Sequence, residues 1–94
     1  MNKDAYQQKA KAKLDEWKAD LDKLKAKAEG ARADAKISAD RRIEELQAKI
    51  DDGEARLNEI SHSSAEAWES LKDGFESASR SIKSAFSDAA DKFR

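Results

Sequence analysis

A single narrow stripe of apolar and small side chains runs through residues 6–60 and limits the folds that this chain can adopt. Its members recur every three or four residues, which is the spacing of one face of an α-helix. The stripe consists of Tyr6, Ala10, Leu14, Trp17, Leu21, Leu24, Ala28, Ala31, Ala35, Ala39, Ile43, Leu46, Ile50, Gly53, Leu57 and Ile60. Because one face of a single rod is too thin to form a core, another helix has to cover it.

A second stripe with the same spacing follows residue 63. It consists of Ser64, Ala67, Trp68, Leu71, Phe75, Ala78, Ile82, Ala85, Phe86, Ala89 and Phe93. Charged residues make up 41% of the chain, proline is absent, and only three glycines interrupt the helix-forming residues. This combination is typical of long helices and coiled coils. The sequence therefore predicts an all-α protein.

The run Ser61–Ser64 is the strongest predicted break between helices. Within it, Ser63 is followed three residues later by Glu66, which fits a capping box. In that motif the hydroxyl and the carboxylate satisfy free N–H groups at the start of a helix. We therefore expect one helix over about residues 3–60 and a second over about residues 64–93.

Folding the second helix back at residue 62 gives a long antiparallel hairpin, or coiled coil, over residues 29–94 of a single domain, 1–94. In the predicted register Leu57 lies beside Trp68. Phe86 and Phe93 then face alanines, as complementary packing of large against small side chains requires. The predicted hairpin core is Ile43, Leu46, Ile50, Leu57, Trp68, Leu71, Phe75, Ile82, Phe86 and Phe93.

In this hairpin, residues 1–28 form an overhanging arm whose large apolar side chains have no partner. Exposing each of them forfeits roughly 2 kcal/mol, so the arm is expected to bind a second copy of the chain. Two antiparallel arms would pair Leu14 with Leu24 and Trp17 with Leu21. The predicted self-association residues are Leu14, Trp17, Leu21 and Leu24. The expected product is a dimer or a higher oligomer.

The alternative is a bend at Gly30. Residues 3–28 would then fold back as the third helix of a monomeric bundle. A lone glycine inside a helix costs only about 1 kcal/mol, so its presence alone does not decide between the two arrangements.

No residue pattern points to catalysis. His62 is the only histidine and cysteine is absent. Glu59 and His62 match the Glu-x-x-His element of di-iron bundles, but such a site needs two of these elements and additional inward-facing glutamates. The many aspartates and glutamates lie on predicted solvated faces, and no glycine-rich phosphate loop occurs. We therefore expect no enzyme activity, no cofactor and no metal site.

The charge pattern bears on partners and location. Six lysines of the first helix alternate with acidic residues, so a solvated helix face is expected rather than a nucleic-acid site. They are Lys9, Lys11, Lys13, Lys23, Lys25 and Lys27. The sequence shows neither a secretory signal nor a membrane-spanning segment, and the expected location is the cytoplasm.

Two segments carry a family resemblance. The run Leu14-Asp15-Glu16-Trp17 and the run from Ala67 to Phe75, which reads AWESLKDGF, resemble small bacterial coiled-coil proteins. That resemblance implies a helical protein without catalytic residues. In composition the chain is also similar to apolipoproteins with amphipathic repeats and to late-embryogenesis-abundant stress proteins, an analogy that concerns composition alone.

The leading functional hypothesis is a non-enzymatic structural or interaction protein that self-assembles through a coiled-coil seam and binds itself, or other helical proteins. A second hypothesis is reversible binding to a membrane surface by the amphipathic C-terminal helix. A third is a stress-associated protectant that stays disordered until the cell dries or becomes crowded.

Overall fold

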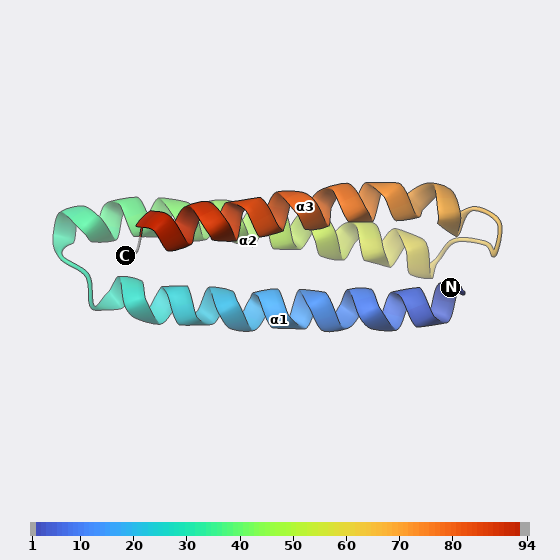
Figure 1. Ribbon diagram of the computed structural model, residues 1–94, viewed down its shortest axis with the longest axis horizontal. Helices are drawn as coiled ribbons and strands as arrows, with labels where there is room; N and C mark the ends of the chain where they lie inside the picture. The colour runs from blue at the N-terminus through green and yellow to red at the C-terminus, as the bar shows by residue number, and fades with distance from the viewer. Residues whose placement is uncertain (1, 93–94) are drawn as a thin grey trace.

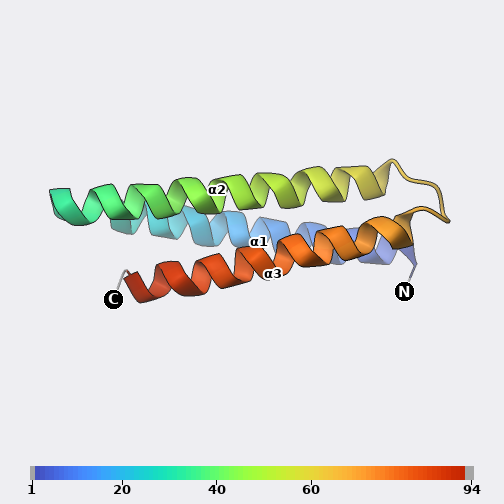
Figure 2. The ribbon, with the colours of Figure 1, turned by 90° about the horizontal axis from the view of Figure 1, so that it is seen from above.

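The computed structural model describes residues 2–92, which form three α-helices packed side by side (Figure 1). Helix α1 spans Lys3–Glu29, α2 spans Ala33–Ser61 and α3 spans Trp68–Lys92. No strand occurs in this range, which confirms the all-α prediction. Helices α1 and α3 run in the same direction and α2 runs in the opposite one (Figures 1 and 2). The bundle measures 50 by 18 by 17 Å.

The chain bends at Gly30, so the predicted continuous helix over residues 3–60 is wrong, and the alternative three-helix arrangement is the one found. Helix α1 ends at Glu29, and the Gly30 N–H donates to the Lys27 carbonyl at 3.2 Å. Residues 3–29 therefore lie along α2 instead of forming an overhanging arm (Figure 1). Glycine inside a continuous helix is about 1 kcal/mol less favourable than alanine, so a break at Gly30 gives up little helix stability. Covering each large apolar side chain of α1 contributes roughly 2 kcal/mol, so burial favours the bend.

The connection between α2 and α3 is longer than predicted. The Ser63 hydroxyl donates to the Ile60 carbonyl at 2.6 Å, so Ser63 closes α2 rather than capping the next helix. Ser64 takes the capping role instead, because its Oγ accepts a hydrogen bond from the Ala67 N–H at 3.1 Å. Helix α3 begins at Trp68, four residues later than the predicted start at residue 64.

This longer connection shifts the register of the hairpin. In the predicted register Leu57 lies beside Trp68, which would place Arg56 near residue 69. In the structure the Arg56 guanidinium lies over Gly74, where an added Cβ would be 2.8 Å from Nη1. The Lys49 ammonium correspondingly donates to Ser81 Oγ at 2.8 Å. As a result, the start of α2 extends beyond the ends of the other two helices (Figures 1 and 2). Ile37, near the start of α2, is 67% exposed.

One apolar core runs along the axis of the bundle and receives side chains from all three helices. Its buried members are Ala10, Leu14, Trp17, Leu21, Leu46, Ile50, Ile60, Trp68, Phe75, Ile82 and Ala89. Side chains of α1 and α3 both meet α2 at Gly53, where an added Cβ would lie 3.2 Å from Leu14 Cδ2 and from Ile82 Cδ1. The absence of a side chain at residue 53 therefore allows α1 and α3 to pack closely on α2.

Local interactions fix the end of the bundle that holds the N-terminus. Asn2 caps α1, because its Oδ1 accepts a hydrogen bond from the Ala5 N–H at 2.8 Å. The Lys3 ammonium donates to the Ser63 carbonyl at 2.6 Å and to the Ser61 carbonyl at 3.3 Å. A cation at the carbonyl end of α2 also interacts favourably with the helix dipole.

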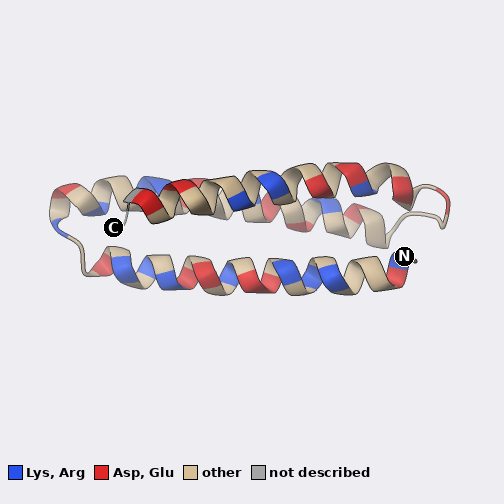
Figure 3. Cartoon of the chain, viewed as in Figure 1, with Lys and Arg blue, Asp and Glu red and all other residues tan. Residues whose placement is uncertain are grey.

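The outer surface carries both charge signs on every helix (Figure 3). Over the residues that the structure describes, no helix combines the length and the apolar character needed to cross a bilayer.

Candidate interaction surface

The single histidine has a structural position. His62 is exposed at the C-terminal end of α2, and its Nδ1 lies 2.8 Å from the Asn58 carbonyl, to which the Nδ1-protonated ring donates. Glu59 is exposed on the same helix. Within residues 2–92, no three His, Asp or Glu side chains come together as potential metal ligands. The Asn58 carbonyl also accepts hydrogen bonds from the Ser61 hydroxyl at 2.7 Å and from the His62 backbone N–H at 3.2 Å, so His62 belongs to the hydrogen bonding that closes the end of α2.

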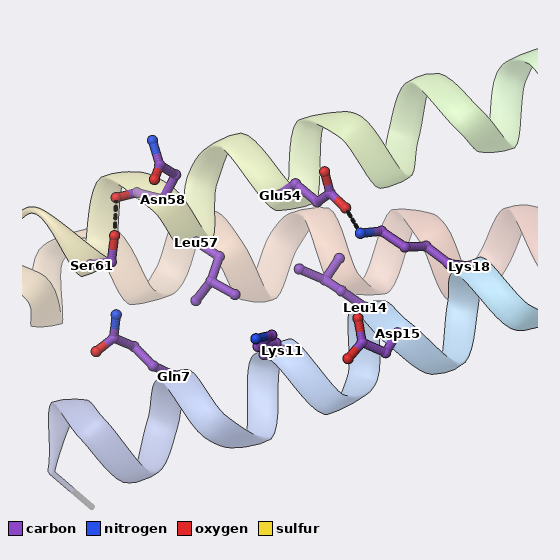
Figure 4. A pocket seen from close by; sticks show the side chains of 9 residues that line it. All are labelled: Gln7, Lys11, Leu14, Asp15, Lys18, Glu54, Leu57, Asn58 and Ser61. Carbon is purple, nitrogen blue, oxygen red and sulfur yellow. Dashed lines mark hydrogen bonds and ion pairs between the residues drawn. The ribbon is translucent and has the colours of Figure 1, made fainter.

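A groove of about 500 Å³ separates α1 from α2 (Figure 4). Leu14 and Leu57 point into the space between the two helices, and polar side chains surround them. The lining residues are Gln7, Lys11, Leu14, Asp15, Lys18, Glu54, Leu57, Asn58 and Ser61. The groove is open to solvent, and both charge signs line it in equal number.

An ion pair between Lys18 and Glu54 crosses this groove (Figure 4). The hydrogen bond with Glu54 raises the pKa of the Lys18 ammonium, and the nearby carboxylates of Asp15 and Asp51 add to the effect. The other two charged side chains of the groove, Lys11 and Asp15, are opposite in sign, so this groove joins α1 to α2 and carries no net charge.

The surface between α1 and α3 differs from the other two helix pairs. Helix α2 packs closely against both neighbours, whereas α1 and α3 approach each other less closely. Two hollows open along this line, one of about 320 Å³ and one of about 240 Å³. The apolar residues that line them are Tyr6, Ala10, Trp17, Leu24, Phe75, Phe86 and Ala90. We call this line of hollows the α1–α3 groove.

Lysines dominate the polar rim of the α1–α3 groove. They are Lys9, Lys13, Lys23, Lys27 and Lys83, and a single acid, Asp20, lines the same hollows. Within the described part of the chain, none of these five lysines forms an ion pair. Lys13 is the one with an aromatic partner, because its Nζ lies 6.0 Å from the centre of the Trp17 ring. The groove thus combines an apolar floor with a mostly unpaired cationic rim.

Aromatic rings close the groove at the end that holds the N-terminus. The Tyr6 ring lies 5.5 Å from the Trp68 ring and meets Phe75 edge-on at 6.1 Å. Lys72 Nζ lies 5.6 Å from the Tyr6 ring. Partial burial, reinforced by the carboxylates of Glu76 and Asp73, raises the pKa of the Tyr6 hydroxyl to about 12. At this end the acidic residues therefore balance the lysine.

The structure places three of the four predicted self-association residues inside the chain's own core. Leu14, Trp17 and Leu21 are buried, and Leu24 is partly exposed at the α1–α3 groove. Self-association through these side chains therefore requires α1 to leave the core of its own chain.

The predicted hairpin-core residues gather in the same core. Leu46, Ile50, Trp68, Phe75 and Ile82 are buried. Four others are partly buried against them: Ile43, Leu57, Leu71 and Phe86. Phe93 lies outside the described residues.

The sequence alone did not identify the α1–α3 groove. The charge pattern predicts a solvated face for the lysines at 9, 13, 23 and 27, and the predicted hairpin register places Phe86 against an alanine. Two facts reveal the groove: α1 folds back beside α3, and the shifted register of α3 brings Phe86 to the same side as Leu24. The sequence nevertheless contained an indication of the lysine rim, because these four lysines flank the apolar stripe of α1 at helical spacing.

Together, the fold and this surface define a small three-helix bundle with a lysine-rimmed apolar groove. Comparison of the chain with protein-family models, with curated proteins and with solved structures finds no match.

Proposed function

We propose that this is a non-enzymatic interaction protein, and that the α1–α3 groove is the surface with which it binds another helix. The observation that supports this proposal is the groove itself, where partly exposed Leu24 and Phe86 lie between lysines that form no ion pair with any acid in residues 2–92. A helix laid along α1 and α3 would complete a four-helix arrangement, which is a common way to cover such a groove.

The rim defines the chemistry of the partner. Five lysines against one aspartate line the two hollows, so an acidic helix is attracted and a basic one is repelled. The floor requires apolar side chains at positions i, i+3 or i+4, and i+7 of that helix. The proposed partner is therefore an amphipathic helix with an apolar stripe and acidic flanks.

A peptide-binding measurement tests this proposal. The probe is a synthetic helix with a leucine stripe and glutamate flanks, and the comparison peptide carries lysines in place of the glutamates. Isothermal titration should detect binding of the acidic peptide, weaker binding at high salt, and no binding of the basic peptide. Equal binding of both peptides would contradict the assignment of the lysine rim.

Charge reversal locates the binding surface. The variant Lys23→Glu/Lys27→Glu alters the rim of the groove, and Lys11→Glu/Lys25→Glu makes the same change in charge elsewhere on α1. The rim variant should weaken binding of the acidic peptide by about tenfold or more, because attraction becomes repulsion at two positions. The control variant should bind within about twofold of wild type once the change in net charge is screened by salt. If the two variants weaken binding equally, the groove is not the docking surface.

Membrane-surface binding by residues 64–93 is the second proposal, and it needs a different state of the molecule. Trp68, Phe75 and Ile82 are buried in the bundle, so α3 has to separate from α1 and α2 before these side chains meet lipid. Co-sedimentation with anionic vesicles at low salt tests this proposal. If the protein stays in the supernatant, the proposal fails.

A further inference from the structure

We propose that this chain also forms a domain-swapped dimer, in which α1 and α2 straighten into one helix and α1 packs against α2 and α3 of a second copy. The inference goes beyond helix docking in the α1–α3 groove and does not depend on it. It rests on three features: the chemistry of the bend at residues 30–32, the phase of the apolar stripe across that bend, and the register between α1 and α2.

The bend is held by weaker local interactions than the other helix ends. Asn2 Oδ1 and Ser64 Oγ each accept a hydrogen bond from a backbone N–H at the start of a helix or turn. Arg32, which precedes α2, makes no such side-chain hydrogen bond. Gly30 has φ −88° and ψ 0°, which lies outside the left-handed region that a glycine helix terminus often uses. The bend therefore contains neither of the two devices that usually fix a helix boundary.

Straightening the bend would satisfy backbone groups that the monomer leaves to solvent. In a continuous helix the N–H groups of residues 32–35 would donate to the carbonyls of residues 28–31. In the bent chain, α2 has the free N–H groups of any first helical turn and no side chain to receive one of them. Apart from Gly30, residues 28–33 are alanine, glutamate and arginine, which all favour helix.

The apolar stripe keeps its helical phase through the bend. Ala28, Ala31, Ala35 and Ala39 follow one another at intervals of three or four residues. In the monomer Ala28 and Ala39 are buried, but Ala35 between them is exposed. Two helices joined by a bend have no need of a common phase, whereas a continuous helix places all four alanines on its covered face. The spacing therefore fits a second, straight state.

The register between α1 and α2 lets the pairs seen within one chain form again between two chains. Lys18 pairs with Glu54, Leu14 lies against Gly53, and Lys3 bonds to Ser63. The midpoints of these pairs all fall within residues 33–36, next to the bend. Two straight helices that cross antiparallel about residues 33–36 would therefore make the same pairs between chains. Such a dimer has twofold symmetry and is closed.

Both states bury the same core, so the balance depends on protein concentration and on the bend. Gly30→Ala favours the straight helix, because alanine is the better helix former and an added Cβ would meet no atom closer than the Lys27 carbonyl oxygen at 3.8 Å. Because the swapped dimer contains two straight helices, this gain counts twice, and the association constant for dimer formation should rise about thirtyfold. Arg32→Pro acts in the opposite direction. Arg32 has φ −64°, which proline adopts readily, whereas proline at this position breaks a continuous helix.

The test measures both mass and the origin of each chain. Wild type, Gly30→Ala, Arg32→Pro and the charge-matched control Arg32→Gln are refolded from denaturant at low and at high protein concentration, and their masses are measured by light scattering. Equal helix content by circular dichroism shows that all four fold. Gly30→Ala should give more dimer than wild type, Arg32→Gln should resemble wild type, and Arg32→Pro should remain monomeric.

Carbodiimide crosslinking of a mixture of ¹⁴N- and ¹⁵N-labelled chains identifies which α1 packs on which α2. This reagent joins Lys18 to Glu54, which form an ion pair. The swapped dimer should give crosslinked peptides of mixed isotope composition, and Lys18→Gln should remove them. The inference is overturned if refolded Gly30→Ala gives only links within one isotope. It is also overturned if Arg32→Pro dimerises as well as wild type, because the dimer then uses another surface.

Discussion

Gly53 and Gly74 both lie inside helices, yet the same substitution is expected to have opposite effects at the two positions. Replacing a helical glycine with alanine contributes about 1 kcal/mol through helix propensity and reduced freedom of the unfolded chain. At Gly53 the added Cβ would lie 3.2 Å from Leu14 Cδ2 and from Ile82 Cδ1. Both neighbours are buried and have little room to move. Overpacking of this kind costs about 1–3 kcal/mol, so Gly53→Ala should lower the free energy of unfolding by about 1 kcal/mol.

At Gly74 the added Cβ would meet only the end of the Arg56 side chain, at 2.8 Å from Nη1. Arg56 is exposed and can swing aside. Gly74→Ala should therefore keep most of the helix-propensity gain and raise the free energy of unfolding by up to about 1 kcal/mol. The expected difference between the two variants is about 2 kcal/mol, and effects on the unfolded chain that are common to both cancel in this difference.

Urea denaturation followed by circular dichroism gives the free energy of unfolding for each variant. In a chain of this size each kcal/mol also shifts Tm by about 4–8 °C, which provides a second measurement. Ile82→Val removes Cδ1, one of the two atoms that the new Cβ would meet. In the background of Ile82→Val, the cost of Gly53→Ala should therefore become smaller. If Gly53→Ala is as stable as Gly74→Ala, the three helices do not meet at residue 53 as described.

Three further effects are expected. Ile82→Ala should lower the free energy of unfolding by about 2–5 kcal/mol in urea denaturation, because Ile82 is 0% exposed; a loss below about 1 kcal/mol would place it outside the core. Asn2→Ala should cost about 1 kcal/mol by removing the cap of α1, with exposed Gln8→Ala as a control that leaves the cap intact. The pKa of Tyr6 is raised to about 12, so its neutral form is favoured in the folded state, and stability should fall as the pH rises from about 10 to about 12. A pH titration followed by phenolate absorbance should give a midpoint near pH 12 for Tyr6, and Glu76→Gln should lower that midpoint. A midpoint at the ordinary tyrosine pKa of about 10 would contradict the burial of the Tyr6 hydroxyl.

The sequence by itself determined the features that depend on neighbouring residues. Apolar spacing of three and four predicted helices throughout, and the serine-rich run at Ser61–Ser64 predicted the second helix break. Membership of the core was also evident, since Leu46, Ile50, Phe75 and Ile82 were all assigned to it. Which of these residues lie beside one another was not evident, because the register of α3 against α2 differs from the predicted one. Helical periodicity is a local effect and can be inferred from a single chain, whereas the capping residue could not, because Ser64 takes the role predicted for Ser63.

Only the tertiary structure decided which helices cover the stripe of α1. The same apolar face can be covered by a second chain or by the chain's own α2 and α3, and the spacing of the residues is identical in both cases. The choice depends on a bend at Gly30, where glycine weakens a continuous helix by only about 1 kcal/mol, and on the burial of Leu14, Trp17 and Leu21 by residues far away in the sequence. The α1–α3 groove follows from the same choice. Leu24 and Phe86 line one hollow only because the bend places α1 beside α3 and the longer turn sets the register of α3.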